Sequence, residues 1–240
     1  MTSKTADDAA GEAAGVDGCA GGWVVCSLRS GIHLYADFAA VLQAFPAATL
    51  FVDIPQGLTS REPRRLESLV RRRLPGKASS VFAVPCREAV YADSYDNACE
   101  INAGRFDRRI SLQSWNICPK IREVDRLLRQ QPDRAPEIYE SHPELCFHLL
   151  GDGHVTASKK TAAGVSQRLA VLERYLEGAG QLYESALASW RRRELARDDI
   201  LDAMVLSLLP VLGFSLLADP DQAYDELGLP IRMALPARFQ

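Results

Sequence analysis

Three short runs that favour β-strands follow one another near the start of the chain. They cover residues 13–17, 23–28 and 32–36, and glycine-rich or polar turns separate them. Strand runs joined by such short turns are typical of an antiparallel meander. Residues 38–45 then carry apolar side chains at helical spacing, and residues 49–54 form an apolar run suited to a strand covered on both faces. This order predicts a mixed sheet in which three antiparallel strands precede strands that are joined through helices.

The rest of the chain continues this alternation. Helical spacing predicts a helix near residues 95–103, a helix over 117–130, and one long or two broken helices over 165–190. A strand is expected at residues 138–140, and a last buried helix over 198–217. We therefore expect an α/β fold with helices flanking the sheet.

Length and composition indicate an ordinary globular protein. The chain has 240 residues, of which 47% are hydrophobic and 25% are charged, so it can bury a full core. We expect residues 1–11 to be a disordered tail and residues 12–218 to form one domain. An insertion or lid is expected at about residues 60–118, and residues 219–240 are expected to be a C-terminal extension.

Charge, cysteines and hydropathy exclude several classes of protein. The net charge of -3 gives no global positive field that would attract nucleic acid or an anionic membrane, so a polyanion would need a local patch. The six cysteines show neither a CxxC pair nor the spacing of a zinc site. The most apolar stretch, residues 204–218, is shorter than the roughly 20 residues that span a bilayer, and the start lacks the pattern of a secretory signal. We expect a cytoplasmic protein with reduced thiols and no membrane contact.

Acidic residues stand where the expected strands end and where the last helix begins. Asp17 and Asp53 follow apolar strand runs, and Glu140 ends the strand candidate at 138–140. The start of the last helix carries three acids: Asp198, Asp199 and Asp202. Offsets of three and four residues put two of these on one helical face. Converging carboxylates are typical ligands of Mg²⁺ or Mn²⁺, and two such ions about 3.5–4 Å apart support chemistry on phosphate.

Each of these acids also has an ordinary structural role open to it. Asp17 could satisfy backbone amides in a turn, and Asp53 could cap a helix or a turn. The acids of the last helix could be its N-cap and first-turn residues, which the helix dipole favours. Three acids stand where a cap needs only one, which favours metal ligation.

Histidine and basic residues are candidates for the remaining roles at such a site. His142 could transfer a proton to the leaving oxygen, although a histidine before a proline is often structural. Five basic residues are candidates for binding substrate phosphate: Arg61, Arg64, Arg65, Lys159 and Lys160. A solvated helix face and a solvated lysine pair are the alternative interpretations.

Seven blocks of the sequence, in one order, resemble the domain-of-unknown-function 429 family. These blocks are GVDGCAGGWVV, FVDIPQGL, SSVFAVPCREAVY, SLQSWNICPKIREVD, YESHPELCF, SKKTAAGVSQR and DDILDAM. The family is described as predicted nucleases, so the resemblance implies a ribonuclease H-like fold over most of the chain. It also implies that Asp17 contacts both metals and that Asp53 is the second acid. Asp199 and Asp202 would then be the acid pair of the closing helix.

We therefore expect a metal-dependent nuclease, a hydrolase that cleaves phosphodiester bonds of nucleic acid or a nucleotide at a two-metal carboxylate site with Mg²⁺ or Mn²⁺. An actin-like or sugar-kinase-like phosphotransferase is an alternative, because its first strand also ends in an aspartate and glycines. No second glycine-rich phosphate loop follows a later strand here. A non-catalytic binding module that keeps the acidic cluster is the third interpretation.

Overall fold

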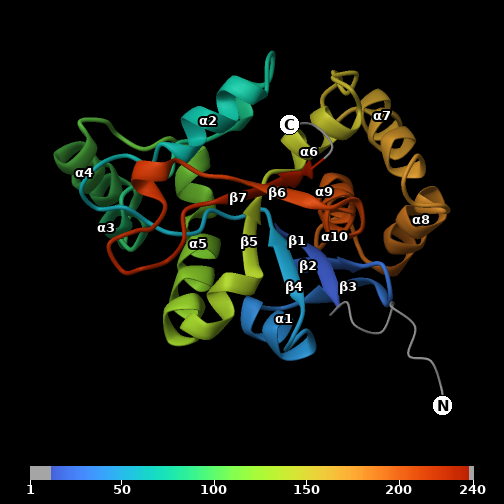
Figure 1. Cartoon of the computed structure of the whole chain (residues 1–240), viewed down its shortest axis with the longest axis horizontal. Helices are drawn as coiled ribbons and strands as arrows, with labels where there is room; N and C mark the ends of the chain where they lie inside the picture. The colour runs from blue at the N-terminus through green and yellow to red at the C-terminus, as the bar shows by residue number, and fades with distance from the viewer. Residues whose placement is uncertain (1–11, 238–240) are drawn as a thin grey trace.

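The computed structural model describes residues 12–237, and Figure 1 shows the arrangement of its elements. The expected tail, residues 1–11, lies outside the described residues. Within that range, seven strands form one sheet: β1 (Ala13–Cys19), β2 (Gly22–Ser27), β3 (Gly31–Tyr35), β4 (Thr49–Val52), β5 (Ile138–Ser141), β6 (Phe214–Leu217) and β7 (Met233–Pro236). The helices are α1 (Phe38–Ala44), α2 (Leu66–Arg73), α3 (Arg87–Val90), α4 (Tyr95–Phe106), α5 (Leu112–Gln130), α6 (Pro143–Leu150), α7 (Ala162–Glu173), α8 (Ala179–Ser189), α9 (Arg197–Ser207) and α10 (Leu209–Leu212).

The sheet is mixed, and its strands lie in the order β3-β2-β1-β4-β5-β7-β6. Strands β1, β2 and β3 pair antiparallel. Strands β1, β4, β5 and β7 pair parallel, and β6 is antiparallel to β7. The predicted α/β fold, with an antiparallel meander followed by parallel strands and flanking helices, is confirmed.

Side chains of the central strands alternate between two apolar cores, one on each face of the sheet. Val24 and Cys26 of β2 belong to the core that α6, α7, α8 and α9 cover. Trp23 and Val25 of the same strand belong to the core that α1 and α5 cover. A third, smaller cluster lies between α3, α4 and the loop that precedes α5, within the region expected as an insertion. None of the described helices combines the length and the apolar character that crossing a bilayer requires.

The C-terminal part of the chain differs from the expectation. The predicted last helix does not continue to residue 217, because α9 ends at Ser207 and the chain leaves α10 at Gly213, whose φ is +76°. Residues 214–217 form β6 instead. The region expected as a C-terminal extension contributes β7, which lies between β5 and β6 and is buried along its length. This strand has only four residues and no polar alternation, so it carries no strand pattern in the sequence.

Helix α9 lies against β1 at a position where the strand has no side chain. A Cβ atom at Gly15 would overlap the carbonyl oxygen of Ala203 and the backbone nitrogen of Ser207. Gly15 and Asp17 are two residues apart on β1, so they face the same side of the sheet. The close approach of α9 therefore brings Asp202, next to Ala203, to the face that carries Asp17.

Adding a methyl group at Gly15 is predicted to destabilise the fold. Gly15→Ala should lower the free energy of unfolding by about 1–3 kcal/mol, because the helix and the strand must move apart. Gly104→Ala is the matched control, since Gly104 is exposed in α4 and a Cβ there meets nothing within 4 Å. The control should be neutral or more stable by up to about 1 kcal/mol, because alanine favours the helix. Urea unfolding of both variants measures the difference, and equal stability would contradict the close contact.

Candidate metal centre

Three carboxylates meet where β1 and β4 end and α9 crosses the sheet. One oxygen each of Asp17, Asp53 and Asp202 lies within 4.8 Å of the corresponding oxygens of the other two. Oxygens that share one Mg²⁺ at about 2.0–2.1 Å are separated by about 3–4 Å, so the three side chains are close to the spacing of a shared ion. Asp17 and Asp202 are buried and Asp53 is half-buried. These residues form the candidate metal centre.

The pairing of the strands sets two of these positions. Strands β1 and β4 are parallel with Val16 opposite Val52, so their carboxyl ends reach the same edge of the sheet. The amide of Asp53 donates to the carbonyl of Val16 at 3.0 Å, which continues the pairing by one residue. The Oδ1 of Asp17 accepts from the amide of Gly18 at 2.7 Å. Both carboxylates are therefore held by backbone geometry.

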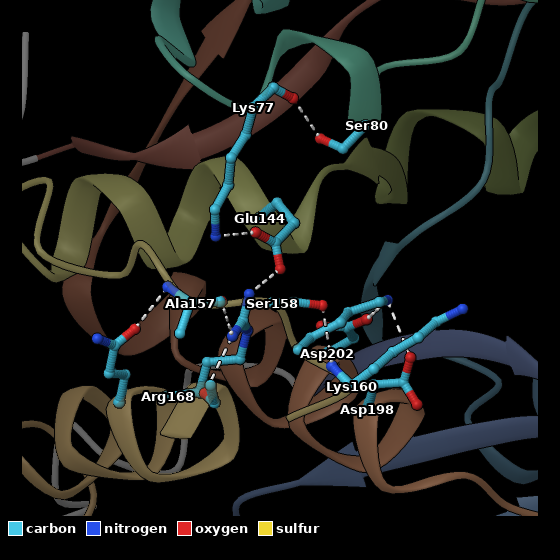
Figure 2. Close-up of polar contacts among 12 residues, drawn as sticks. Lys77, Ser80, Glu144, Ala157, Ser158, Lys160, Arg168, Asp198 and Asp202 are labelled. Atoms are coloured by element: carbon cyan, nitrogen blue, oxygen red, sulfur yellow. Dashed lines mark hydrogen bonds and ion pairs between the residues drawn. The ribbon is translucent and has the colours of Figure 1, made fainter. Parts of the chain in front are cut away.

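Asp202 reaches the centre from α9 and is only 1% exposed. Its Oδ2 accepts from the Nζ of Lys159 at 2.6 Å, and the same ammonium lies 3.5 Å from Oδ2 of Asp198. Figure 2 shows the contacts at Asp198 and Asp202. The Oδ1 of Asp202 is buried and has no hydrogen-bond partner among the described residues. A buried carboxylate oxygen without a partner is costly, and a cation would satisfy it.

Each carboxyl group of the triad has a raised pKa, because it is buried near other acidic groups. Burial, followed by the charges of Asp53 and Asp202, raises the pKa of Asp17 well above its ordinary value. Burial and the charge of Asp202 raise the pKa of Asp53 to about 8. Burial raises the pKa of Asp202 to about 6, although Lys159 opposes the shift. One ammonium therefore does not balance three buried carboxylates, and a divalent cation would complete the compensation.

Asp199, the other acid predicted as a ligand on α9, lies outside the triad. Its Oδ2 accepts from the amide of Ala196 at 3.2 Å, so it caps the start of the helix. The capping role that the sequence left open describes Asp199, while Asp202 at the next turn faces the centre. The rotation of α9 about its own axis determines that Asp202, and not Asp199, faces the other two carboxylates.

Glu140 and Arg64 form a separate buried ion pair. The Oε2 of Glu140 accepts from Nη2 of Arg64 at 2.7 Å and from the amide of Gln56 at 2.9 Å. Arg64 also lies 3.2 Å from Oε1 of Glu67 and donates to the carbonyls of Gln56 and Gly57. Arg64 was expected to bind substrate phosphate; the structure places its guanidinium inside the protein, where these groups contact it. Glu140 lines the cavity, but its Oε2 belongs to this pair.

The other basic candidates differ in where the structure puts them. Arg61 and Lys160 are exposed, and the side chain of Arg65 is 43% exposed and pairs with Glu62 at 2.9 Å. None of these three lines the cavity at the centre, whereas Lys159 does. Of the five candidates, Lys159 is therefore the one that lines the cavity of the candidate metal centre.

A cavity of about 290 Å³ lies next to the triad. His142 lines it from the start of α6, and its Nδ1 accepts from the amide of Leu145 at 3.2 Å. Burial lowers the pKa of His142 to about 4, so the ring is neutral at pH 7 and carries its hydrogen on Nε2. A hydrogen bond with the backbone of Ser80 also engages the ring, and a proton transfer that needs the cationic form of His142 is disfavoured at neutral pH.

Two charged residues that line the cavity were not predicted as site residues from the sequence. Lys120 of α5 donates to the carbonyl of Gly22 and lies 4.5 Å from the centroid of the Trp23 ring. Glu144 of α6 binds Lys77 at 2.7 Å and also pairs with Arg168, as Figure 2 shows. Lys120 lies three residues after Ile117, so the two share one face of α5. This spacing was the sequence signal that could have placed Lys120 at the cavity. No local pattern marks the partners of Glu144.

Comparison with known protein families gives one match. A family model described as "Protein of unknown function (DUF429)" matches residues 15–210. This range contains all three carboxylates of the metal centre, and its description names no activity. Comparisons with curated proteins and with solved structures give no match.

Two adjacent arginines test the assignment of Arg64 to a structural ion pair. Arg64→Met should lower the free energy of unfolding by about 3–5 kcal/mol, because Glu140 and Glu67 would remain buried without their partner. Arg65→Met is the control and should cost less than about 1 kcal/mol, because its ion pairs are exposed. Denaturant unfolding of the two variants gives both values. A small effect at Arg64 would show that its guanidinium is not needed inside the protein.

The raised pKa of Asp53 predicts how stability depends on pH when divalent cations are removed. A carboxyl group whose pKa is higher in the folded state stabilises the fold at low pH, and this contribution is lost as the pH rises from about 4 through about 8. Asp53→Asn stays uncharged, so without cations it should be more stable than the wild type by more than about 1 kcal/mol at pH 8. The difference should shrink towards pH 4.

Denaturant unfolding with a chelator at both pH values measures this effect. Asp37→Asn is the control, because Asp37 is an exposed N-cap of α1 and asparagine also caps helices well. A less stable Asp53→Asn protein at pH 8 would show that the carboxylate is well compensated without a metal ion.

Proposed function

The chain belongs to the domain-of-unknown-function 429 family, and we propose that it is a metal-dependent nuclease whose cation is held by Asp17, Asp53 and Asp202. The observation that carries this proposal is the convergence of three carboxylates from β1, the end of β4 and α9 on one buried point. Mg²⁺ and Mn²⁺ both suit such a set of oxygen ligands.

The chemistry of the donors fits a divalent cation. The triad offers carboxylate oxygens only, and one buried oxygen of Asp202 has no hydrogen-bond partner. A purely structural cluster would leave this negative charge buried against a single ammonium, which is unfavourable. Two cations were expected from the sequence. The described residues bring together one such group of three, and the proposal requires one cation there.

The arrangement of the sheet supports a hydrolase of the ribonuclease H-like type. Three antiparallel strands come first, parallel strands follow, and the first strand carries an acid that meets an acid from a late helix. A bound divalent cation would lower the pKa of a water molecule and stabilise the leaving oxygen. The residues of the chain would hold the phosphate beside it.

Three side chains would act on the substrate around the triad. Lys159 binds Asp202 and also lines the cavity, so its ammonium would face a phosphate oxygen. Lys120 lines the same cavity from α5 and adds a second positive charge. His142 lines the same cavity with a neutral ring. These groups supply the positive charge and the donors that a phosphodiester needs in a buried site.

Replacing a ligand of the centre is predicted to abolish both metal binding and cleavage. The wild type should cleave members of a panel of single-stranded, duplex, hybrid and branched nucleic acids with Mg²⁺ or Mn²⁺ and not with a chelator. Asp17→Asn should lower the rate by more than about a hundredfold, because even the outer partners of metal ligands are worth about 10–100-fold. Asp37→Asn, which changes the exposed N-cap of α1, should keep wild-type activity.

Thermal unfolding separates binding from catalysis. Mg²⁺ should raise the Tm of the wild type and of Asp37→Asn, because the ion binds the folded state, and it should not raise that of Asp17→Asn. A rise in Tm without cleavage of any substrate would favour the non-catalytic binding module. Absence of both effects would overturn the metal centre itself.

A further inference from the structure

A second hollow of about 410 Å³ lies beside the cavity of the metal centre. Residues 81–84 line both hollows, so the two share one wall. The second hollow is bounded by Arg71 of α2, by Arg108 and Arg109 before α5, and by the first turn of α5. No acidic side chain is among the described residues that line it. We refer to it as the basic hollow.

Hydrogen bonds from three directions hold the wall and rim of the basic hollow in place. Arg71 donates to the carbonyl of Val81 from Nε at 3.1 Å and from Nη2 at 2.8 Å. The hydroxyl of Ser114 donates to the carbonyl of Ala83 at 3.1 Å. The buried side chain of Asn102 donates to the carbonyl of Arg108 at 2.8 Å and accepts from the amide of Cys86 at the same distance. The hollow is therefore built by fixed backbone rather than by loose surface side chains.

The charge of the basic hollow is poorly compensated. Arg108 is exposed and forms no ion pair among the described residues. Arg109 lies 3.6 Å from Asp96, and both side chains are largely exposed, so this pair contributes little. Helix α5 begins here with Ser111 as its cap and has no acid in its first turn, so the positive end of its dipole adds to the field. In a chain of net charge -3, this is a local site for an anion.

The shared wall also exposes an aromatic ring. Phe82 is 38% exposed and lines both hollows. An exposed aromatic ring between two phosphate-binding positions is a surface on which a nucleic-acid base can stack. The triad, by contrast, is recessed, since Asp17 is 7% exposed and Asp202 is 1% exposed. A phosphodiester must enter the cavity to reach it, which a flexible single strand can do more readily than a rigid duplex.

We propose that the basic hollow binds a phosphate of single-stranded nucleic acid next to the one at the metal centre, with a base stacked on Phe82. This inference rests on the proposed nuclease function and names its substrate class. Arg108 and Arg109 would contact the phosphate directly. Arg71 would hold the wall, because its guanidinium already donates to Val81.

The salt dependence of binding tests the basic hollow without any cleavage. A fluorescent single-stranded oligonucleotide is titrated by anisotropy with protein in Mg²⁺ at several salt concentrations, and every protein carries Asp17→Asn to prevent hydrolysis. Each lost phosphate contact on a single strand lowers the slope of log K against log salt by about 0.7, so Arg108→Gln with Arg109→Gln, which together would lose one phosphate contact, should lower it by about 0.7. Both residues are exposed, so this variant should fold normally.

The matched control removes two adjacent exposed arginines elsewhere. Arg192→Gln with Arg193→Gln lies in the connection between α8 and α9, and α8 and α4 are on opposite sides of the molecule in Figure 1. The control should keep the wild-type slope. An unchanged slope in the Arg108 and Arg109 variant, or tighter binding of a duplex than of a single strand, would overturn the basic hollow as a subsite. Neither result depends on cleavage, so the proposed function is judged separately by the activity of the protein that retains Asp17.

Discussion

The close contact between α9 and β1 at Gly15 is the constraint on which the metal centre depends. Because the strand has no side chain there, the helix backbone approaches the sheet and presents Asp202 to the face that carries Asp17. The parallel pairing of β1 with β4 then brings Asp53 to the same edge. Asp17 and Asp202 therefore lie on regular elements, and Asp53 directly follows β4 and continues its pairing with β1 by one residue, which favours a rigid site.

Two buried groups of charges lie close together in this protein, and they differ in how well they are balanced. One guanidinium, that of Arg64, faces the two carboxylates of Glu140 and Glu67 and also donates to two backbone carbonyls, although its Nε has no hydrogen-bond partner among the described residues. Within residues 12–237, the triad sets three carboxylates against one bonded ammonium, that of Lys159, and one oxygen of Asp202 has no hydrogen-bond partner. Charges that a fold leaves unbalanced mark a functional site more often than balanced ones do. The basic hollow, which shares the wall of residues 81–84 with the cavity of the triad, has an excess of positive charge instead.

The sequence predicted the elements whose signals are local. The meander of β1, β2 and β3 was predicted because short strands and glycine turns follow one another. Asp17 was predicted on its first strand, and Asp53 at the end of the apolar run that forms β4. It could not separate Asp199 from Asp202, because that choice depends on how α9 is rotated against the sheet. It also could not show that Arg64 is buried, since its partner Glu140 is 76 residues away.

The position of β7 has a consequence for how the chain reaches its native state. This strand, near the C-terminus, lies inside the sheet, and Ser141 of β5 bonds to Ala234 of β7 across 93 residues of chain. During synthesis on the ribosome, β6 is made before the strand with which it pairs. The sheet can therefore close only when β7 emerges, and until then β5 keeps an unpaired edge of the kind that invites aggregation. Formation of β7 is thus the closing step of folding, and removing this strand would open the sheet rather than trim its surface.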